Sequence, residues 1–341
     1  MRLKSALRRG VAAAVIAGIV VSSGIPAYAA QWDIADGNIT VKAGDAEGTN
    51  RVTQGEKDVE DTDTVITGES KENTVTIDTS GGDVDVTFDD LKIDASDKGE
   101  AAVRVEGGGD VTIELDGDNE LKSGAGHAGL EHNKTDTSGE LTIQDKDKNG
   151  SLEAVGGFKG AGIGSAGSND AQVKITGGNI TATSDDWGAG IGSGSDGTAY
   201  VEITGGEINA TGGYLGAGIG GGCNGSGNVT ISGGGITAAG GEGAAGIGGG
   251  YYNGATVTIT GDAVIKNASN TKYGAGIGGG YGYDGDVTIS GNAKIENATG
   301  GYGAAGIGGG AFISPDKIGN GNVVIKENAE IDNVQGGAYG A

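Results

Sequence analysis

Short runs in which apolar and polar residues alternate fill most of this chain, and they recur at a regular spacing. The core Ala-Gly-Ile-Gly returns at intervals of about 28–30 residues, a period typical of proteins built from stacked repeats. In such proteins each unit buries its apolar face against its neighbours. The isoleucines of this core are Ile163, Ile191, Ile219, Ile247, Ile277 and Ile307.

Each repeat contains two further extended pieces with a period of two residues. One is Val-x-Ile, as at Val173/Ile175, and the other centres on an isoleucine such as Ile180. Alternation with this period predicts strands, and no segment shows helical periodicity. Three short strands per coil of about 28–30 residues, each paired with its equivalent one coil later, predict an all-β, single-stranded parallel β-helix. The crossover preference of parallel strands predicts a right-handed solenoid.

The alternation also assigns faces within the Ala-Gly-Ile-Gly strand. We expect its alanine and isoleucine to point inward and its glycines outward, which would leave a bare strip along the outside. Such a strip could let a flat polymer approach the backbone, or the glycines could simply ease tight bends. Asx-Gly pairs such as Asp196-Gly197 and Asn224-Gly225 predict turns into the next strand, with stacked amide side chains.

The N-terminal residues are typical of a leader for export. Basic residues precede an apolar run over about 11–25, and Ala27-Tyr28-Ala29 matches a small-residue cleavage signal. We therefore assign residues 1–29 to a signal peptide. This assignment predicts a secreted or extracellular protein, and a variant of the hypothesis attaches that protein to the cell surface. No other long apolar run exists, so we expect no membrane insertion.

We assign residues 30–100 to an N-terminal cap with the first irregular coils, and residues 101–341 to the parallel β-helix repeats. Ile77, Val103 and Leu130 extend the repeat series backwards at less regular spacings of similar length. The acidic stretch over about 44–63 is interpreted as a loop or an irregular cap. The last residues repeat Tyr273-Gly274-Ala275, so we expect the chain to stop inside a repeat, with a cell-wall anchor lost with the C-terminus.

The mature chain is strongly acidic. Removing the leader leaves 18 lysines and arginines against 46 acidic residues, a formal charge of −28. This charge disfavours nucleic acid and anionic membranes as partners, and it suits cations or simple solubility. The single cysteine, Cys223, forms no internal disulfide.

One acidic stretch matches the opening of a calcium-binding loop. Asp145, Asp147 and Asn149 occupy ligand positions 1, 3 and 5, a glycine follows at position 6, and Glu153 stands at position 9. Position 12 is a glycine, so the closing bidentate glutamate is missing. The prediction is a structural calcium ion held by these four residues; the alternative is an Asx-rich turn without a metal.

The few aromatic residues gather at one point in the period. One group precedes the glycine motif by four or five residues, and the other follows the motif. We predict a carbohydrate-binding corner here, because exposed rings beside amide and acidic groups suit the apolar faces and hydroxyls of sugars. The predicted binding residues are Trp187, Tyr214, Tyr273, Tyr302, Tyr251, Tyr252, Tyr281 and Tyr283.

The sequence singles out no catalytic residue, and it favours a protein that is not an enzyme. The mature chain has two histidines, His127 and His132, and two arginines, Arg51 and Arg104. A β-helix lyase that acts on acidic sugars would need a basic residue beside calcium, and Arg104 is the one arginine placed in a coil. Carboxylate pairs are abundant, but none stands out as a glycosidase pair.

The pattern Val-x-Ile-x-Gly-Gly-x-Ile followed by Gly-Ala-Gly-Ile-Gly-Gly-Gly resembles secreted Gly-rich β-helix proteins of Gram-positive and gut bacteria. Residues 101–107 and 121–126 are similar to a carbohydrate-binding-domain family with a clostridial parallel β-helix member, and the resemblance covers about 32–341. It implies cell-surface display, binding of cellulose or acidic sugars, and structural calcium. The segment His127-Ala128-Gly129-Leu130 departs from the family pattern.

Three functions follow from these observations. The first is a non-catalytic β-helix that binds polysaccharide or a cell-surface glycan. The second is an adhesin stalk or spacer without a small ligand of its own. The third is a calcium-dependent polysaccharide lyase.

Overall fold

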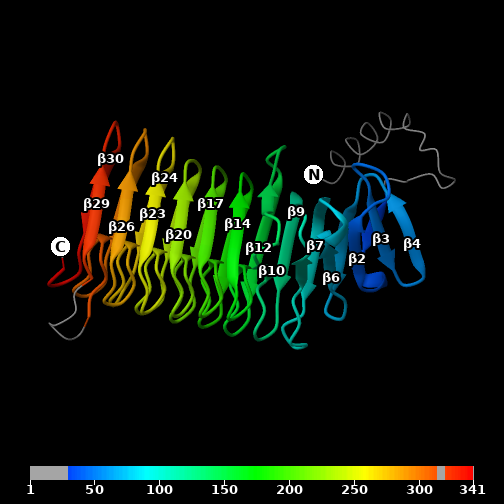
Figure 1. The fold of residues 1–341 in the computed structure, drawn as a ribbon, viewed down its shortest axis with the longest axis horizontal. Coiled ribbons are helices and arrows are strands. Elements are labelled where there is room, and N and C mark those ends of the chain that lie inside the picture. Colours follow the sequence, from blue (N-terminus) through cyan, green and yellow to red (C-terminus); the bar gives the residue numbers. More distant parts are fainter. Residues whose placement is uncertain (1–29, 313–318, 341) are drawn as a thin grey trace.

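The protein is an all-β parallel β-helix, as the repeat pattern predicts. The computed structural model describes residues 30–312 and 319–340. Successive coils lie side by side in one row, from the N-terminal cap in blue to the last coil in red (Figure 1). Within each regular coil three strands follow one another, and each pairs in parallel with the equivalent strand of the next coil.

Three stacks of strands make up the walls of the solenoid. Stack 1 contains β2 (Ile39–Ala43), β6 (Val75–Asp78), β8 (Val103–Glu106), β10 (Leu130–Lys134), β13 (Ile163–Gly164), β16 (Ile191–Gly192), β19 (Ile219–Gly220), β22 (Ile247–Gly248), β25 (Ile277–Gly278) and β28 (Ile307–Gly308). Stack 2 contains β1 (Gln31–Asp33), β5 (Val65–Ser70), β7 (Val84–Asp94), β9 (Val111–Lys122), β11 (Leu141–Gln144), β14 (Asp170–Ile175), β17 (Ala199–Ile203), β20 (Gly227–Ile231), β23 (Ala255–Ile259), β26 (Gly285–Ile289) and β29 (Gly321–Ile325). Stack 3 begins with the last residues of β5 and the second halves of β7 and β9, and it continues through β12 (Gly150–Gly156), β15 (Asn179–Ser184), β18 (Glu207–Thr211), β21 (Gly235–Ala239), β24 (Val264–Ser269), β27 (Lys294–Thr299) and β30 (Glu330–Gln335).

The repeat isoleucines form ladders inside the solenoid. Ile191 pairs with Ile219, and Ile219 pairs with Ile247, in register along stack 1. All three side chains are fully buried, as is Ile180 of stack 3. Burial of one such side chain stabilises a protein by about 1.5–3 kcal/mol, so the stacked ladders supply a core that no single coil could form.

The predicted bare outer strip of glycines is wrong. The glycines before the repeat isoleucines are buried, and a Cβ atom added at Gly218 would lie 2.6 Å from the oxygen of Gly246 and 2.7 Å from the nitrogen of Ala239. The short strand of stack 1 therefore packs on both of its faces. On the glycine face, its backbone lies against the backbone at the end of the stack 3 strand. A glycine is required because any side chain would force the two backbones apart.

A second column of glycines meets two constraints at once. Gly220 has φ +131°, and a Cβ atom added there would lie 2.0 Å from the oxygen of Gly248 in the next coil. The same conformation recurs at the end of each short strand from β13 to β28. The Ile-Gly step therefore ends the strand and allows coils to stack at the spacing of hydrogen-bonded strands, about 4.8 Å.

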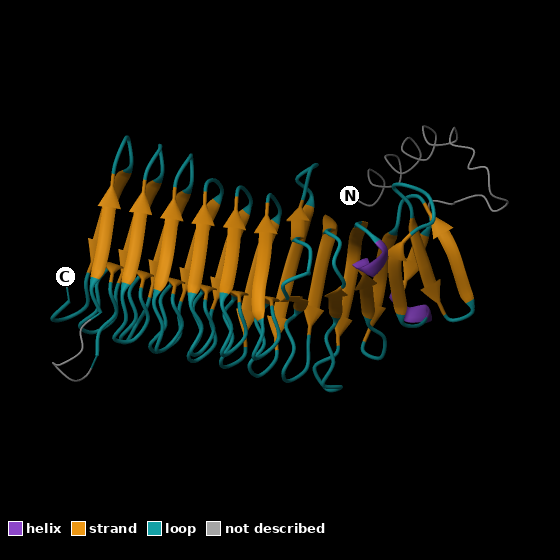
Figure 2. Ribbon diagram, in the orientation of Figure 1, coloured by secondary structure: helices purple, strands orange, loops and turns teal. Residues whose placement is uncertain are grey.

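The turns lie at two opposite edges of the solenoid. Short turns join stack 2 to stack 3, and longer loops flank the strands of stack 1 at the other edge (Figure 2). Asp196 and Asn224 adopt left-handed conformations, with φ of 64° and 57°, as predicted for these two Asx-Gly pairs, whereas at Asn253-Gly254 the left-handed residue is Tyr252, one position earlier. The Nδ2 of Asn224 donates to Oδ1 of Asp196 at 2.9 Å, so amide and carboxylate groups do stack from coil to coil here.

The first coil carries a hairpin instead of the expected loop. β3 (Asn50–Gln54) pairs antiparallel with β2, and β4 (Lys57–Asp61) pairs antiparallel with β3. Stack 1 continues through β6, where Val75 pairs with Val103. The repeat position is thus Val75 and not Ile77, because Ile77 pairs with Val105 further along the same strand.

Helices contribute almost nothing to the described part of the chain. Two 3-10 turns, η1 (Ile34–Asp36) and η2 (Thr79–Gly81), follow strands of the first coils. Within residues 30–312 and 319–340, no helix has the length and apolarity needed to cross a membrane. The signal peptide predicted for residues 1–29 lies outside the described residues.

Candidate functional site

The loops on the two sides of each stack 1 strand lie against each other in neighbouring coils. The nitrogen of Tyr281, after β25, donates to the oxygen of Gly243, before β22, at 2.7 Å. The nitrogen of Ala311, after β28, donates to the oxygen of Tyr273, before β25, at 2.8 Å. The two aromatic groups that stand before and after the glycine motif in the sequence are therefore brought to one corner.

Seven rings at this corner form a continuous cluster, with centroids 4.0–6.4 Å apart between neighbours. We call it the tyrosine cluster, and its members are Tyr251, Tyr252, Tyr273, Tyr281, Tyr302, Phe312 and Tyr339. Tyr281 is its centre and is only 5% exposed. Its ring stacks on Tyr251 at 5.0 Å and meets Tyr273 edge to face at 5.3 Å.

Two glycines make room for these rings. A Cβ atom at Gly243 would lie 2.3 Å from Cδ2 of Tyr251, and one at Gly282 would lie 2.7 Å from Cδ2 of Phe312. Gly282 also has φ +74°, a conformation that suits glycine. The loop glycines thus position the aromatic cluster as well as the backbone.

The outer members of the cluster are open to solvent. Tyr302 is 56% exposed, Tyr252 is 43% exposed, and Tyr339 is almost fully exposed. The Oη of Tyr251 lies 3.2 Å from Oη of Tyr252, and burial raises the pKa of the Tyr251 phenol. The Tyr251 phenol therefore keeps its proton, and the hydroxyls of the cluster can donate hydrogen bonds while the exposed ring faces offer flat apolar surface.

Three of the predicted carbohydrate-binding residues lie apart from this cluster. Trp187 packs on Phe158 at 5.1 Å, with the ammonium of Lys159 5.1 Å from the Trp187 ring. Tyr214 donates from Oη to Oε2 of Glu242 at 2.8 Å. Tyr283 is exposed and contacts no other ring in the part of the chain that the structure describes.

The surroundings of Tyr214 are charged. Lys272 forms an ion pair with Glu242, and this contact, followed by the Tyr214 hydroxyl, lowers the pKa of the Glu242 carboxyl. The hydrogen bond to Glu242 in turn raises the pKa of Tyr214. Glu242 replaces the aromatic residue of its coil, and it links the Tyr214 coil to the Lys272 coil by polar contacts instead of ring stacking.

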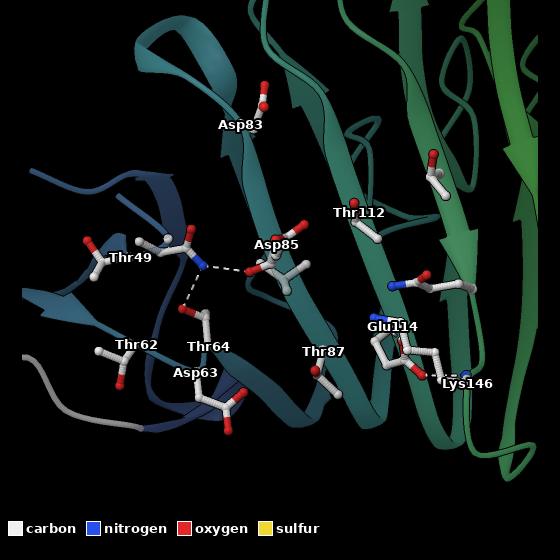
Figure 3. Close-up of a pocket in the computed structure, with 15 residues that line it drawn as sticks. Thr49, Thr62, Asp63, Thr64, Asp83, Asp85, Thr87, Thr112, Glu114 and Lys146 are labelled. Carbon is white, nitrogen blue, oxygen red and sulfur yellow. Dashed lines mark hydrogen bonds and ion pairs between the residues drawn. The ribbon is translucent and has the colours of Figure 1, made fainter. Parts of the chain in front are cut away.

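A cleft of about 690 Å³ lies between the N-terminal hairpin and the outer faces of β7, β9 and β11 (Figure 3). The side chain of Asn50 ties the hairpin to this sheet, because its Nδ2 donates to Oγ1 of Thr64 at 2.9 Å and to the oxygen of Asp85 at 2.6 Å. Burial, and then the charge of Asp61, raise the pKa of Asp63. The polar lining consists mainly of Thr49, Thr62, Thr64, Thr87, Thr112, Thr142, Asp63, Asp83, Asp85, Glu114, Gln144 and Lys146.

One end of the cleft holds the predicted calcium loop. An oxygen from each of Asp145, Asp147 and Glu114 lies within 4.8 Å of the others. Oε2 of Glu114 is buried without a hydrogen bond among the described residues, and the ammonium of Lys146 stands 3.7 Å from it. The three carboxylates are hard oxygen ligands that fit calcium, and a cation here would satisfy the Glu114 oxygen.

The loop motif did not indicate Glu114, and the prediction named Glu153 as the further carboxylate ligand. Glu153 lies on β12, paired in register with Glu120 and Thr181, and it is not part of the carboxylate group. Asn149 stays beside the group, since its Nδ2 donates to Oδ2 of Asp147 at 3.1 Å. Glu114 precedes Asp145 by about one coil, so the repeat period itself was the signal that could have found it.

Arg104 is held by a buried carboxylate. Its Nε lies 3.4 Å from Oε1 of Glu131, which is only 2% exposed. Nδ1 of His127 lies 2.7 Å from the other oxygen of Glu131, and the three residues line a cavity of about 730 Å³. His132 points elsewhere, with Nδ1 3.2 Å from the oxygen of Gln172. No member of the described carboxylate group lines this cavity, so Arg104 is not beside the candidate calcium site.

Comparison with known protein families agrees with the fold. A family model described as a beta helix repeat matches residues 173–195, 201–223, 229–251 and 287–311. No curated protein and no solved structure is significantly similar to the chain. The match supports a parallel β-helix built from repeats, while the similarity to a clostridial carbohydrate-binding family stays a prediction.

Proposed function

We propose that this parallel β-helix protein is exported and binds a polysaccharide or cell-surface glycan without cleaving it. The observation that carries the proposal is the tyrosine cluster, which runs across successive coils and leaves Tyr252, Tyr302 and Tyr339 open to solvent. Coils stack at about 4.8 Å, so a polymer lying along the solenoid would meet one ring after another.

The chemistry of the corner suits a neutral or acidic glycan. Ring faces pack against the apolar faces of sugars, and the phenol hydroxyls donate hydrogen bonds to hydroxyl or carboxylate oxygens. Tyr281 is too buried to contact a ligand, so its role is to hold Tyr251 and Tyr273 in place. We further propose that calcium binds at Glu114, Asp145 and Asp147 as a structural ion.

The test is retention on insoluble cellulose and pectin, with and without calcium. We expect the chain to be retained on at least one of them, and Tyr302→Ala together with Tyr252→Ala to abolish retention. Tyr200→Ala is the matched control, because Tyr200 is 42% exposed but lies on β17 outside the cluster. Retention that survives the cluster substitutions would contradict the proposed site.

Failure of every glycan to retain the folded chain would favour the adhesin stalk. If a glycan does retain the chain, Trp187→Ala and Tyr214→Ala test whether the rings outside the tyrosine cluster carry the binding. Loss of binding in these two variants alone would move the site to the coils of Trp187 and Tyr214.

A calcium-dependent lyase is a second candidate, and one observation favours it. Lys146 is a basic residue at the carboxylate group, where its ammonium pairs with Glu114, whereas Arg104 lies in a different cavity. Calcium that took the place of this ammonium at Glu114 would leave Lys146 as the basic residue beside the cation, and its neutral form could remove a proton next to a bound carboxylate. Unsaturated products from pectin that disappear in Lys146→Ala would support this activity, and their absence would exclude it for that substrate.

A further inference from the structure

Asp61, at the end of β4, is a buried carboxylate at the start of the solenoid. It is 0% exposed. Nε1 of Trp32 donates to its Oδ2 at 2.6 Å, and the backbone nitrogens of Ala30 and Asp63 each donate to its Oδ1 at 3.1 Å. The carboxylate thus joins the hairpin to the first strand, β1.

The donors to this carboxylate in the described part of the chain are neutral. Among the described residues, no lysine, arginine or histidine lies within ion-pair distance of Asp61. The neighbouring acidic residue, Asp63, has its pKa raised by burial and by the charge of Asp61. A buried charge is costly unless an opposite charge is paired with it, so the position favours a positive group.

The missing positive group is one that processing would create. We propose that hydrolysis of the Ala29–Ala30 peptide bond releases an α-ammonium group on Ala30 that forms an ion pair with Asp61. Water adds across the amide, Ala29 leaves with the new carboxylate, and the Ala30 nitrogen becomes a protonated amine. The inference rests on the export proposed above, which supplies the leader peptidase.

The position of the Ala30 nitrogen is fixed independently of the residues before it. The nitrogen of Val65 donates to the oxygen of Ala30 at 3.3 Å, and Gln31 pairs with Val65 in the parallel ladder of β1 and β5. Cleavage one residue earlier or later would move the charge by about 3.8 Å along the chain, away from Oδ1 of Asp61. The ion pair therefore forms only when the mature chain begins at Ala30.

Processing would then strengthen the end of the solenoid. A hydrogen bond from an uncharged amide becomes an ion pair, which supplies the opposite charge that the buried carboxylate otherwise lacks. Among the described strands β1 pairs with β5 alone, so it depends on this contact more than an internal strand would. The mature chain should hold its first coil more firmly than the precursor does.

The experiment compares two forms of the chain from Ala30 to Ala341, one with a free amino group and one acetylated at Ala30. Urea unfolding of both is measured at about pH 6 and about pH 10. At the lower pH we expect an unfolding equilibrium constant about tenfold smaller for the free amine, since only that form pairs the buried carboxylate with an opposite charge. The unfolded α-amino pKa is about 8 and the pairing raises the folded value, so the difference is full below pH 8 and is lost as pH rises through the folded pKa.

Asp61→Asn should remove the difference between the two forms. If that variant does not fold, the two forms of the unsubstituted chain still decide the question. Equal unfolding midpoints for those two forms would overturn the inference. N-terminal sequencing of the exported protein supports it if the first residue is Ala30 and overturns it if another residue comes first. None of these measurements involves a glycan, so they stand apart from the test of carbohydrate binding.

Discussion

The rings of Tyr251 and Tyr281 lie face to face, 5.0 Å apart and within 8° of parallel, although a whole repeat separates them in the chain. They meet because one coil of the solenoid spans that repeat, as the pairing of Ile247 with Ile277 shows. The contact makes Tyr281 the hub of a cluster whose rim is exposed. The aromatic residues of the cluster therefore have two roles. The buried ring of Tyr281 holds its neighbours in place, whereas the rings of Tyr252 and Tyr302 face solvent.

Tyr281→Ala is expected to destabilise the protein. The ring is buried and packs on four neighbours, so its loss leaves a cavity, and truncation of a buried aromatic residue costs about 3–5 kcal/mol. Urea unfolding measures the change. Tyr283→Ala is the matched control and should change stability by no more than about 0.5 kcal/mol, because exposed side chains outside such contacts contribute little. Equal effects of the two substitutions would contradict the assigned roles.

Gly220→Ala is expected to disrupt coil stacking. The new Cβ atom would lie 2.0 Å from the oxygen of Gly248, on a residue with φ +131°. Gly48→Ala is the control, since Gly48 also has a positive φ but nothing within 4 Å of the added atom. The control should lose about 1–2 kcal/mol from backbone strain alone, and Gly220→Ala should lose clearly more. Denaturant unfolding of both variants tests whether the close approach matters.

Calcium is expected to stabilise the N-terminal coils. A ligand that binds only the folded state at 100 times its Kd adds about 2.7 kcal/mol, so the thermal midpoint should rise with calcium and fall again with EDTA. Glu114→Gln and Asp145→Asn should remove the rise. Glu153→Gln should keep it, because Glu153 lies outside the carboxylate group. A response that depends on Glu153 instead would restore the ligand set expected from the loop motif.

Stability is expected to fall below about pH 6.5 because of His132. Burial is the main cause that lowers the pKa of this ring, so the folded protein holds it neutral while the unfolded chain, with an ordinary pKa of about 6.5, takes up a proton. The free energy of unfolding therefore decreases as pH falls from about 6.5 toward the folded pKa. His132→Gln should flatten this part of the profile, measured by urea unfolding at about pH 7 and about pH 5.5. An unchanged slope would show that other groups carry the dependence.

The architecture could be predicted from the sequence alone. The repeat isoleucines and the Val-x-Ile pairs recur at one period, and burial of equivalent residues in register is the one arrangement that gives each short coil a core. The period also implies which coils are neighbours. It could not tell that the glycines before Ile163 and its equivalents face backbone, because that depends on how closely stack 1 approaches stack 3.

Which side chains meet at the loops and the cap depends on the folded backbone. Tyr273 and Tyr281 belong to different loops, and their contact arises because hydrogen bonds join those loops across coils. Glu114 reaches Asp145 from the neighbouring coil. A motif read within one loop cannot reveal a ligand that another coil supplies. Asp61 meets Ala30 because an antiparallel hairpin folds back over β1. Alternation along a strand specifies faces, whereas contacts between loops and caps depend on the path of the backbone between them.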